Sequence, residues 1–194
     1  MDKEISQDIA QGKETYYRQD GKKFSVLCLG GIKWVSHTRG ASIREVETVA
    51  LEQDVIPPRY FRNIGTIGRA GQIKLLRSSV AVVGAGGLGG VVIEFLARYG
   101  IGRLIIIDYD RFTETDLNRH LMATEENLGE YKVTIAARRL NEINSAIEVT
   151  THRDQLTKDN VRDLFKGVHI AVDCLDNLPS RFIVEDACRD LGIP

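Results

Sequence analysis

One segment constrains the fold of this chain more than any other, the glycine-rich run Gly84-Ala-Gly-Gly-Leu-Gly89. It follows a β-branched run, Ser79–Val83, and opens an amphipathic stretch over Gly87–Tyr99. A strand, a glycine turn and a helix in this order favour phosphate binding, because the first glycine permits the tight turn, the second lets backbone approach a phosphate, and the third lets the helix pack on the strand. The helix N-terminus adds free N–H groups and partial positive charge. We therefore predict nucleotide contacts at Gly84, Gly86, Gly87 and Gly89.

Strand and helix patterns alternate through the chain after Gly71. The short apolar runs are bounded by turn residues and are typical of buried parallel strands. The predicted buried strands are Ser79–Val83, Arg103–Ile107 and His169–Cys174, and Glu148–His152 is predicted as a strand of mixed character. The predicted helices are Gln72–Leu76, Gly87–Tyr99, Glu130–Ile143, Asp159–Phe165 and Arg181–Leu191. This alternation predicts an α/β fold, a Rossmann-like, mostly parallel sheet with helices on both faces, and we assign it to a domain over residues 57–194.

Residues 1–56 lack this alternation and are predicted to form an N-terminal arm with at least one helix. Ser42 and Glu45 have the spacing of a capping box, which places a helix start at Ile43. The helix must end before Pro57-Pro58, since a proline pushes the preceding residue out of the α region. No residue of the arm indicates a particular chemistry.

An acidic residue, Asp108, follows the predicted strand Arg103–Ile107, about 20 residues after the glycine run. In this position a carboxylate can accept hydrogen bonds from ribose hydroxyls. The glycine run and Asp108 do not by themselves distinguish NAD from ATP, and an NAD-dependent dehydrogenase would be the default interpretation.

Further motifs stand in a fixed order around these two features. They are Arg59-Tyr60-Phe61-Arg62, Asp108-Tyr-Asp110, Leu117-Asn118-Arg119, Lys132 and Asp173-Cys-Leu-Asp176-Asn177. With this set the sequence resembles the ThiF/MoeB/HesA adenylyltransferases, which are related to ubiquitin-activating enzyme. The resemblance covers residues 59–194 and rests on several separate motifs.

The resemblance implies ATP and Mg²⁺ as cofactors and gives the motif residues roles. Arg119 and Lys132 would neutralise the triphosphate, and Arg62 would reach the ATP of a neighbouring subunit in a homodimer. Asp176 would hold the magnesium ion, which takes few protein carboxylates, and Asp108 would hold the ribose. The implied catalytic residues are thus Arg62, Arg119, Lys132 and Asp176. Other implied nucleotide contacts are Asp110, Thr115, Asp116, Asn118 and Asn177.

The implied reaction is the adenylylation of a carboxylate, in the family the C-terminal glycine of a ubiquitin-like sulfur-carrier protein in thiamine, molybdopterin or related pathways. A carboxylate with a pKa of about 3.5 is already ionised at neutral pH and attacks phosphorus without a general base. Catalysis then depends on alignment and on stabilising the departing pyrophosphate.

Two residues depart from the family pattern. Asp116 stands where the family usually has Asn, and His120 follows the arginine where it usually has Gln. The sequence also lacks any C-x-x-C pair, so we predict no zinc in it. Cys174 and Cys188 are interpreted as small buried hydrophobic residues rather than nucleophiles.

Composition limits the partners. Lys plus Arg number 26 and Asp plus Glu number 27, and this near-zero net charge argues against nucleic acid or an acidic membrane as the main partner. Three scattered cysteines and a polar N-terminal segment without an apolar core favour the cytoplasm.

The length of 194 residues suits one α/β domain. The sequence stops where the family continues with another strand and the carrier-docking region, so we expect a truncated piece or a minimal member. Three other functions stay open: adenylylation of a small-molecule carboxylate, a non-catalytic nucleotide-binding partner subunit, and NAD binding.

Overall fold

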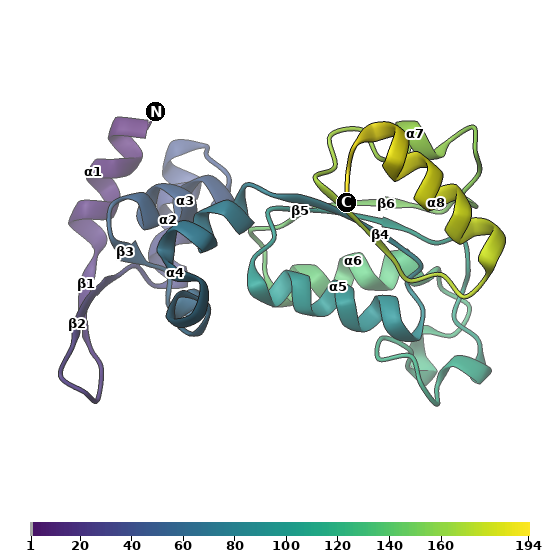
Figure 1. Ribbon diagram of the computed structural model, residues 1–194. Coiled ribbons are helices and arrows are strands. Elements are labelled where there is room, and N and C mark those ends of the chain that lie inside the picture. Colours follow the sequence, from purple (N-terminus) through teal and green to yellow (C-terminus); the bar gives the residue numbers. More distant parts are fainter. Residues whose placement is uncertain (1) are drawn as a thin grey trace. The chain divides into compact units, whose positions relative to one another are not determined.

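The computed structural model describes residues 2–194, which fall into two compact units, Met1–Leu76 and Arg77–Pro194 (Figure 1). The first unit extends to Leu76 because helix α4 (Phe61–Leu76) packs on α3 (Ile43–Glu52), where Leu51, Tyr60 and Leu76 form a small buried cluster. The predicted domain boundary between residues 56 and 57 stays a prediction. No helix of the described residues is long and apolar enough to cross a membrane.

The first unit holds more regular structure than the sequence predicted. Its remaining elements are α1 (Asp2–Gly12), β1 (Glu14–Tyr17), β2 (Lys23–Val26), α2 (Leu29–Arg39), β3 (Val55–Ile56) and the 3-10 turn η1 (Pro58–Tyr60). Strands β1 and β2 form an antiparallel hairpin, and β3 pairs parallel with β2. The predicted capping box is confirmed, since the N–H of Glu45 donates to the Ser42 hydroxyl and the Glu45 carboxylate accepts from the Ser42 N–H.

Helix α4 is longer than the predicted Gln72–Leu76. It begins at Phe61 and contains a kink at Gly68, whose φ of 69° and ψ of 172° interrupt the helical backbone. Gly65, Gly68 and Gly71 weaken the sequence signal for a helix in its first part, because glycine lowers helix propensity.

The second unit is an α/β sheet in the order β6-β5-β4-β7, and all its strand pairs are parallel. The strands are β4 (Ser79–Val83), β5 (Arg103–Ile107), β6 (Glu148–His152) and β7 (Ile170–Asp173). The helices and 3-10 turns are α5 (Gly87–Tyr99), η2 (Glu114–Asp116), η3 (Glu125–Asn127), α6 (Lys132–Ile143), α7 (Val161–Leu164) and α8 (Leu178–Leu191). The predicted fold class is confirmed, and β4, β5, β6 and α5 have the predicted bounds.

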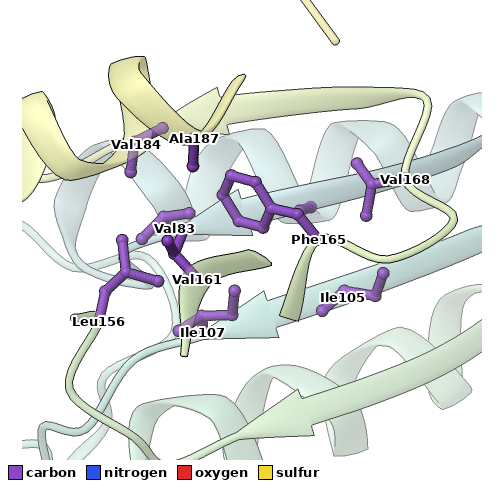
Figure 2. Packing of buried hydrophobic residues seen from close by; sticks show 10 residues of the cluster. Val83, Ile105, Ile107, Leu156, Val161, Phe165, Val168, Val184 and Ala187 are labelled. Carbon is purple, nitrogen blue, oxygen red and sulfur yellow. The ribbon is translucent and has the colours of Figure 1, made fainter. Parts of the chain in front are cut away.

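Two layers of helices cover the sheet, α5 and α6 on one face and α7 and α8 on the other (Figure 1). Because side chains alternate along a strand, each strand contributes to both layers. Val83 and Ile107 point toward α7 and α8, where Phe165 and Val184 complete a buried apolar cluster (Figure 2). Burial on both faces is what makes the central strands β4 and β5 nearly continuous apolar runs in the sequence, whereas β6 at the sheet edge is partly exposed and mixed.

Three more helices and one strand differ from their predicted bounds. Helix α7 spans Val161–Leu164 rather than Asp159–Phe165, and β7 spans Ile170–Asp173 rather than His169–Cys174. Helix α8 begins at Leu178 rather than Arg181, because Asn177 caps it by accepting a hydrogen bond from the N–H of Ser180 (3.0 Å). Helix α6 begins at Lys132 rather than Glu130.

Candidate functional site

The parallel sheet brings four strand ends to one edge. Strand β4 lies between β5 and β7, so the chain changes direction there, and this switch point is where ligands bind in open α/β sheets. A cleft of about 530 Å³ opens at this edge. Its lining includes many of the predicted residues: Gly84, Gly86, Gly87, Asp108, Asp110, Asp116, Arg119, Lys132, Asp176 and Asn177.

The glycine loop requires its first and last glycines for steric reasons. Gly84 has a φ of 94°, and a Cβ there would lie 2.7 Å from the carbonyl oxygen of Cys174. A Cβ on Gly89 would lie 1.8 Å from the carbonyl oxygen of Gly84. The loop therefore folds tightly on itself at the start of α5, whose first N–H groups have no acceptor within the helix and suit an anion.

Asp108 ties the end of β5 to the glycine loop. Its carboxylate accepts hydrogen bonds from the N–H of Ala85 (2.7 Å) and from the N–H of Asp110 (2.8 Å). Burial raises the pKa of Asp108, and the two N–H donors and Lys132 offset this only in part. Each carboxylate oxygen can accept more than one hydrogen bond, so the predicted ribose contact is compatible with this arrangement.

Lys132 is a buried cation at the first position of α6. Its Nζ lies 3.0 Å from Asp110 Oδ2, and its side chain is only 9% exposed, whereas that of Asp110 is 48% exposed. A buried ammonium beside one exposed carboxylate can exchange that partner for a more highly charged anion. This geometry suits a phosphate site.

Arg119 and Asp176, which both follow the glycine loop in sequence, line the cleft. The Arg119 guanidinium is 57% exposed and donates to the carbonyl oxygen of Thr115 (2.6 Å) and to Asn118 Oδ1 (3.0 Å). Asp176 is exposed, and Asn177 Nδ2 lies 3.5 Å from its Oδ1.

The residues fit a magnesium ion only as part of a nucleotide complex. Among the described residues, no group of three His, Cys, Asp or Glu side chains could hold a metal. Mg²⁺ is commonly bound by one or two carboxylates together with phosphate oxygens and water. Asp176, which lines the cleft, is a carboxylate of the kind that such a complex requires from the protein.

Asp116 and His120, the two departures from the family pattern, are buried side by side. Asp116 Oδ2 accepts from the N–H (2.9 Å) and the hydroxyl (3.1 Å) of Thr113, while Asp116 Oδ1 lies 3.4 Å from His120 Nδ1. Burial acts to raise the pKa of Asp116, but the Thr113 hydrogen bonds and nearby cations outweigh it and lower that pKa. Burial lowers the pKa of His120, and Lys132 and Arg119 add to the effect.

Several predicted residues have local roles or lie elsewhere. Asn177 lines the cleft while its side chain caps α8. The Thr115 hydroxyl pairs with that of Thr113 (2.9 Å), and Asn118 accepts from Arg119. Arg62 is an exposed residue of α4 and belongs to the other compact unit. The nucleotide contacts predicted for these residues stay predictions.

The cleft also has lining residues that the sequence did not single out. Asp154 and Gln155 follow β6, Tyr109 follows Asp108, and Ser180 lies in the first turn of α8. The signal for the first two was present, because the carboxyl ends of all parallel strands meet at one edge and β6 ends at His152.

The two cysteines of this unit, Cys174 and Cys188, are half-buried. Burial, with a smaller contribution from Asp173, raises the pKa of Cys174 to about 11, and burial also raises that of Cys188. Thiols with raised pKa values form little thiolate and make poor nucleophiles. The raised pKa values agree with the prediction that these thiols are not nucleophiles, whereas both side chains are half-buried rather than fully buried.

The comparison with known families decides the identity of the fold. The family model described as "ThiF family" matches residues 60–194. The chain belongs to the ThiF family. The match begins in the motif Arg59-Tyr60-Phe61-Arg62 and includes the whole cleft of the second unit.

Relatives of this ThiF-family chain include adenylyltransferases. It is 48% identical over 138 residues to the "adenylyltransferase and sulfurtransferase MOCS3" of Aedes aegypti, which is 70% of this chain and 32% of the relative. It is 38% identical over 138 residues to the "sulfur carrier protein adenylyltransferase" of Thermus thermophilus, which is 70% of this chain and 51% of the relative. The chain therefore spans about a third to a half of the length of these relatives.

A solved structure with the same fold contains nucleotide. The E. coli tRNA N6-threonylcarbamoyladenosine dehydratase TcdA, in complex with ATP, matches with a TM-score of 0.69 and 31% identity. The match covers 71% of this ThiF-family chain and 57% of TcdA.

Proposed function

We propose that this ThiF-family chain binds ATP with Mg²⁺ and adenylylates a carboxylate, releasing pyrophosphate. The observation that carries the proposal is the cleft at the sheet switch point, where the glycine loop, a buried Lys132, Arg119 and Asp176 gather. An NAD site does not require two cations and an exposed carboxylate beside the glycine loop. The ATP complex of TcdA and the adenylyltransferase names of the relatives support this choice.

The chain's residues would act by binding and alignment. Lys132 and Arg119 place positive charge beside the glycine loop, where the α5 N-terminus also favours phosphate. Asp108 holds the loop through Ala85 and has lone pairs left for the ribose. Asp176 would hold the magnesium ion, which supplies charge neutralisation on the phosphates when it is bound.

The reaction itself needs no general base. One carboxylate oxygen of the substrate forms a bond to the α-phosphorus of ATP, the bond from that phosphorus to the bridging oxygen breaks, and pyrophosphate leaves with the electron pair. The products are an acyl adenylate and pyrophosphate. The side chains of this chain contribute most as pyrophosphate leaves. Arg119 and Lys132 then stabilise the negative charge that develops on it.

We propose the C-terminal glycine of a ubiquitin-like sulfur-carrier protein as the substrate carboxylate, in the thiamine, molybdopterin or a related pathway. The support is the name "sulfur carrier protein adenylyltransferase" of the Thermus relative. A small-molecule carboxylate is the alternative substrate, and a non-catalytic partner subunit is the alternative function.

We further propose a cytoplasmic homodimer in which Arg62 of one subunit reaches the ATP of the other, with neither nucleic acid nor membrane as a partner. The near-zero net charge supports the exclusion of polyanionic partners. Residues 57–194 are the proposed ATP-binding domain.

The test is ATP–pyrophosphate exchange with Mg²⁺, using candidate carrier proteins that end in Gly-Gly, a set of small acids, and no acceptor at all. We expect labelled pyrophosphate to enter ATP only when a carrier protein is present. Exchange with a small acid alone would favour the alternative substrate. Binding of ATP with no exchange for any acceptor would favour the non-catalytic subunit, and binding of NAD in preference to ATP would contradict the proposal.

A further inference from the structure

His120 occupies a position in the cleft that the residue roles above leave unexplained. It is only 8% exposed, yet it lines the cleft. Its Nδ1 is one of the few buried side-chain atoms among the described residues without a hydrogen-bond partner. Such atoms in a folded protein call for an explanation, and a ligand-dependent role is a common one.

The two ring nitrogens of His120 face different surroundings. Nδ1 lies 3.4 Å from Asp116 Oδ1. The opposite edge of the ring lies against the glycine loop: a Cβ on Gly86 would be 3.5 Å from Cε1 and 3.7 Å from Nε2, and a Cβ on Gly87 would be 3.5 Å from Cδ2. One nitrogen therefore faces a carboxylate, and the other faces the backbone against which phosphates would lie.

Asp116 is held so that it keeps this orientation. Its Oδ2 is occupied by the N–H and the hydroxyl of Thr113, in the capping box of η2. Its other oxygen, Oδ1, faces His120 Nδ1 and lies 3.6 Å from Arg119 Nη2. Phe112 packs edge-on against the His120 ring, with ring centroids 6.2 Å apart.

A neutral imidazole cannot satisfy both sides once phosphate is present. It carries one N–H, so a proton on Nδ1 turns the Nε2 lone pair toward the phosphate oxygens, and a proton on Nε2 turns the Nδ1 lone pair toward Asp116. In either tautomer two acceptors face each other. The imidazolium donates from both nitrogens and removes both conflicts.

The charges around the ring differ between the free and the nucleotide-bound chain. In the free chain, burial, Lys132 and Arg119 lower the pKa of His120, and Asp116 and Asp108 oppose them without reversing the shift. The glycine loop contributes no titratable side chain. Phosphates placed against that loop would add negative charge next to Nε2 and raise the pKa.

We propose that His120, oriented by Asp116, binds a phosphate oxygen of the nucleotide through Nε2 as a cation, so that nucleotide binding takes up a proton. The proposal rests on the proposed function, because it needs phosphates in this cleft. It assigns a joint role to the two positions that depart from the family pattern. ATP affinity is then greatest at pH values below the free-state pKa of His120 and falls as pH rises through the raised pKa of the complex.

The test is calorimetric titration of the 194-residue chain with Mg·ATP from about pH 5.5 to about pH 8.5, a range that includes the ordinary pKa of histidine, about 6.5. His120→Gln is the matched variant, since an amide donates a hydrogen bond without titrating. We expect the Kd of the unmodified chain to rise about tenfold more over this range than that of H120Q, which corresponds to a pKa difference of about one between free and bound states. ATP's own titration is common to both proteins and cancels in the comparison.

Proton uptake gives a readout that does not depend on the variant. Titrations in two buffers of different ionisation enthalpy should show net proton uptake on binding of ATP, and none on binding of adenosine, which lacks phosphate. Asp116→Asn provides a second variant and should reduce the uptake.

The outcomes separate the two proposals. ATP binding with no proton uptake, and with the same pH dependence in H120Q, would overturn the role of His120 and leave the proposed function intact. Failure of ATP to bind at any pH would overturn both proposals.

Discussion

The two compact units both bury ionisable side chains, but they use them differently. In the first unit, Glu47 is completely buried, and its carboxylate accepts a hydrogen bond from the Tyr60 hydroxyl (2.8 Å), which is itself inside the core. In the second unit, Lys132, Asp116 and His120 are also buried, at 6–8% exposure, but they line a cleft. The difference follows from topology, since parallel strands bring their polar ends to one edge, whereas Glu47 lies in the middle of a helix. Burial of charge thus marks a site only where the fold leaves space beside it.

The glycine loop offers the strongest test of the second unit. Gly89→Ala places a Cβ 1.8 Å from the Gly84 carbonyl oxygen, so backbone must move, and we expect a loss of about 3 kcal/mol or more of stability together with loss of ATP binding. Gly90→Ala is the matched control on the same helix, where the nearest atoms to the new Cβ, Met122 Cγ and the Ala85 carbonyl oxygen, lie at 3.8 and 3.9 Å. We expect this variant to gain about 0.5–1 kcal/mol, the usual benefit of Ala over Gly in a helix. Urea unfolding measures the stability of both variants, and ATP titration measures their binding of ATP. A Gly89→Ala chain that unfolds at the same urea concentration as Gly90→Ala would contradict the steric argument.

Arg119 tests whether the cleft, rather than surface charge in general, carries the chemistry. Arg119→Ala should reduce ATP–pyrophosphate exchange by at least about 10²-fold, the scale for losing one key electrostatic group. Asp176→Ala should have an effect of the same order for the same reason.

Arg111 is the matched control, because it too is exposed and donates to a backbone carbonyl, that of Gly129 (2.6 Å), but does not line the cleft. Arg111→Ala should change exchange by less than about fivefold, since exposed surface contacts contribute about 1 kcal/mol or less. Equal losses in the two arginine variants would mean that the effect comes from segment folding and not from the site.

The sheet was predictable because its signals are local. Strands β4, β5 and β6 are short β-branched or apolar runs bounded by turn residues, and their bounds agree with the prediction. The hairpin β1–β2 was not predicted, although Asp20-Gly21 within its loop is a hairpin signal and Gly21 has the expected positive φ of 80°. The exposed strand β1 lacks the alternation of apolar and polar residues that marks a half-buried strand.

The site was predictable as a set of residues but not as a set of contacts. Motif order identified Asp108 and Lys132, yet it gave no sign that Asp108 accepts from the glycine loop or that Lys132 pairs with Asp110. In the sequence Asp116 stood out as an implied nucleotide contact and a departure from the family pattern, and His120 only as a departure. They lie in 3-10 and turn structure that has no periodicity to read, so their contact became visible only in the fold.

Glu47 provides the smallest expected effect and tests the first unit. Burial raises the pKa of Glu47, and Arg59 and the Tyr60 hydroxyl offset this only in part. The folded state therefore holds the proton more tightly than the unfolded state. Glu47 contributes stability that is present below its unfolded pKa and is lost as pH rises through the raised folded pKa.

Glu47→Gln should remove this loss of stability, because the amide does not ionise. As pH rises from acid to neutral, the free energy of unfolding of the variant should increase relative to that of the unmodified chain, by less than about 2 kcal/mol. Tyr60→Phe should do the opposite and steepen the pH dependence, since it removes a donor that favours the carboxylate. Trp34, the single tryptophan, lies in the first unit, so urea unfolding followed by its fluorescence reports on the right region. If all three proteins gave parallel stability profiles between acid and neutral pH, Glu47 would not be the group that titrates, and the contrast between a core carboxylate and the cleft carboxylates would lose its energetic basis.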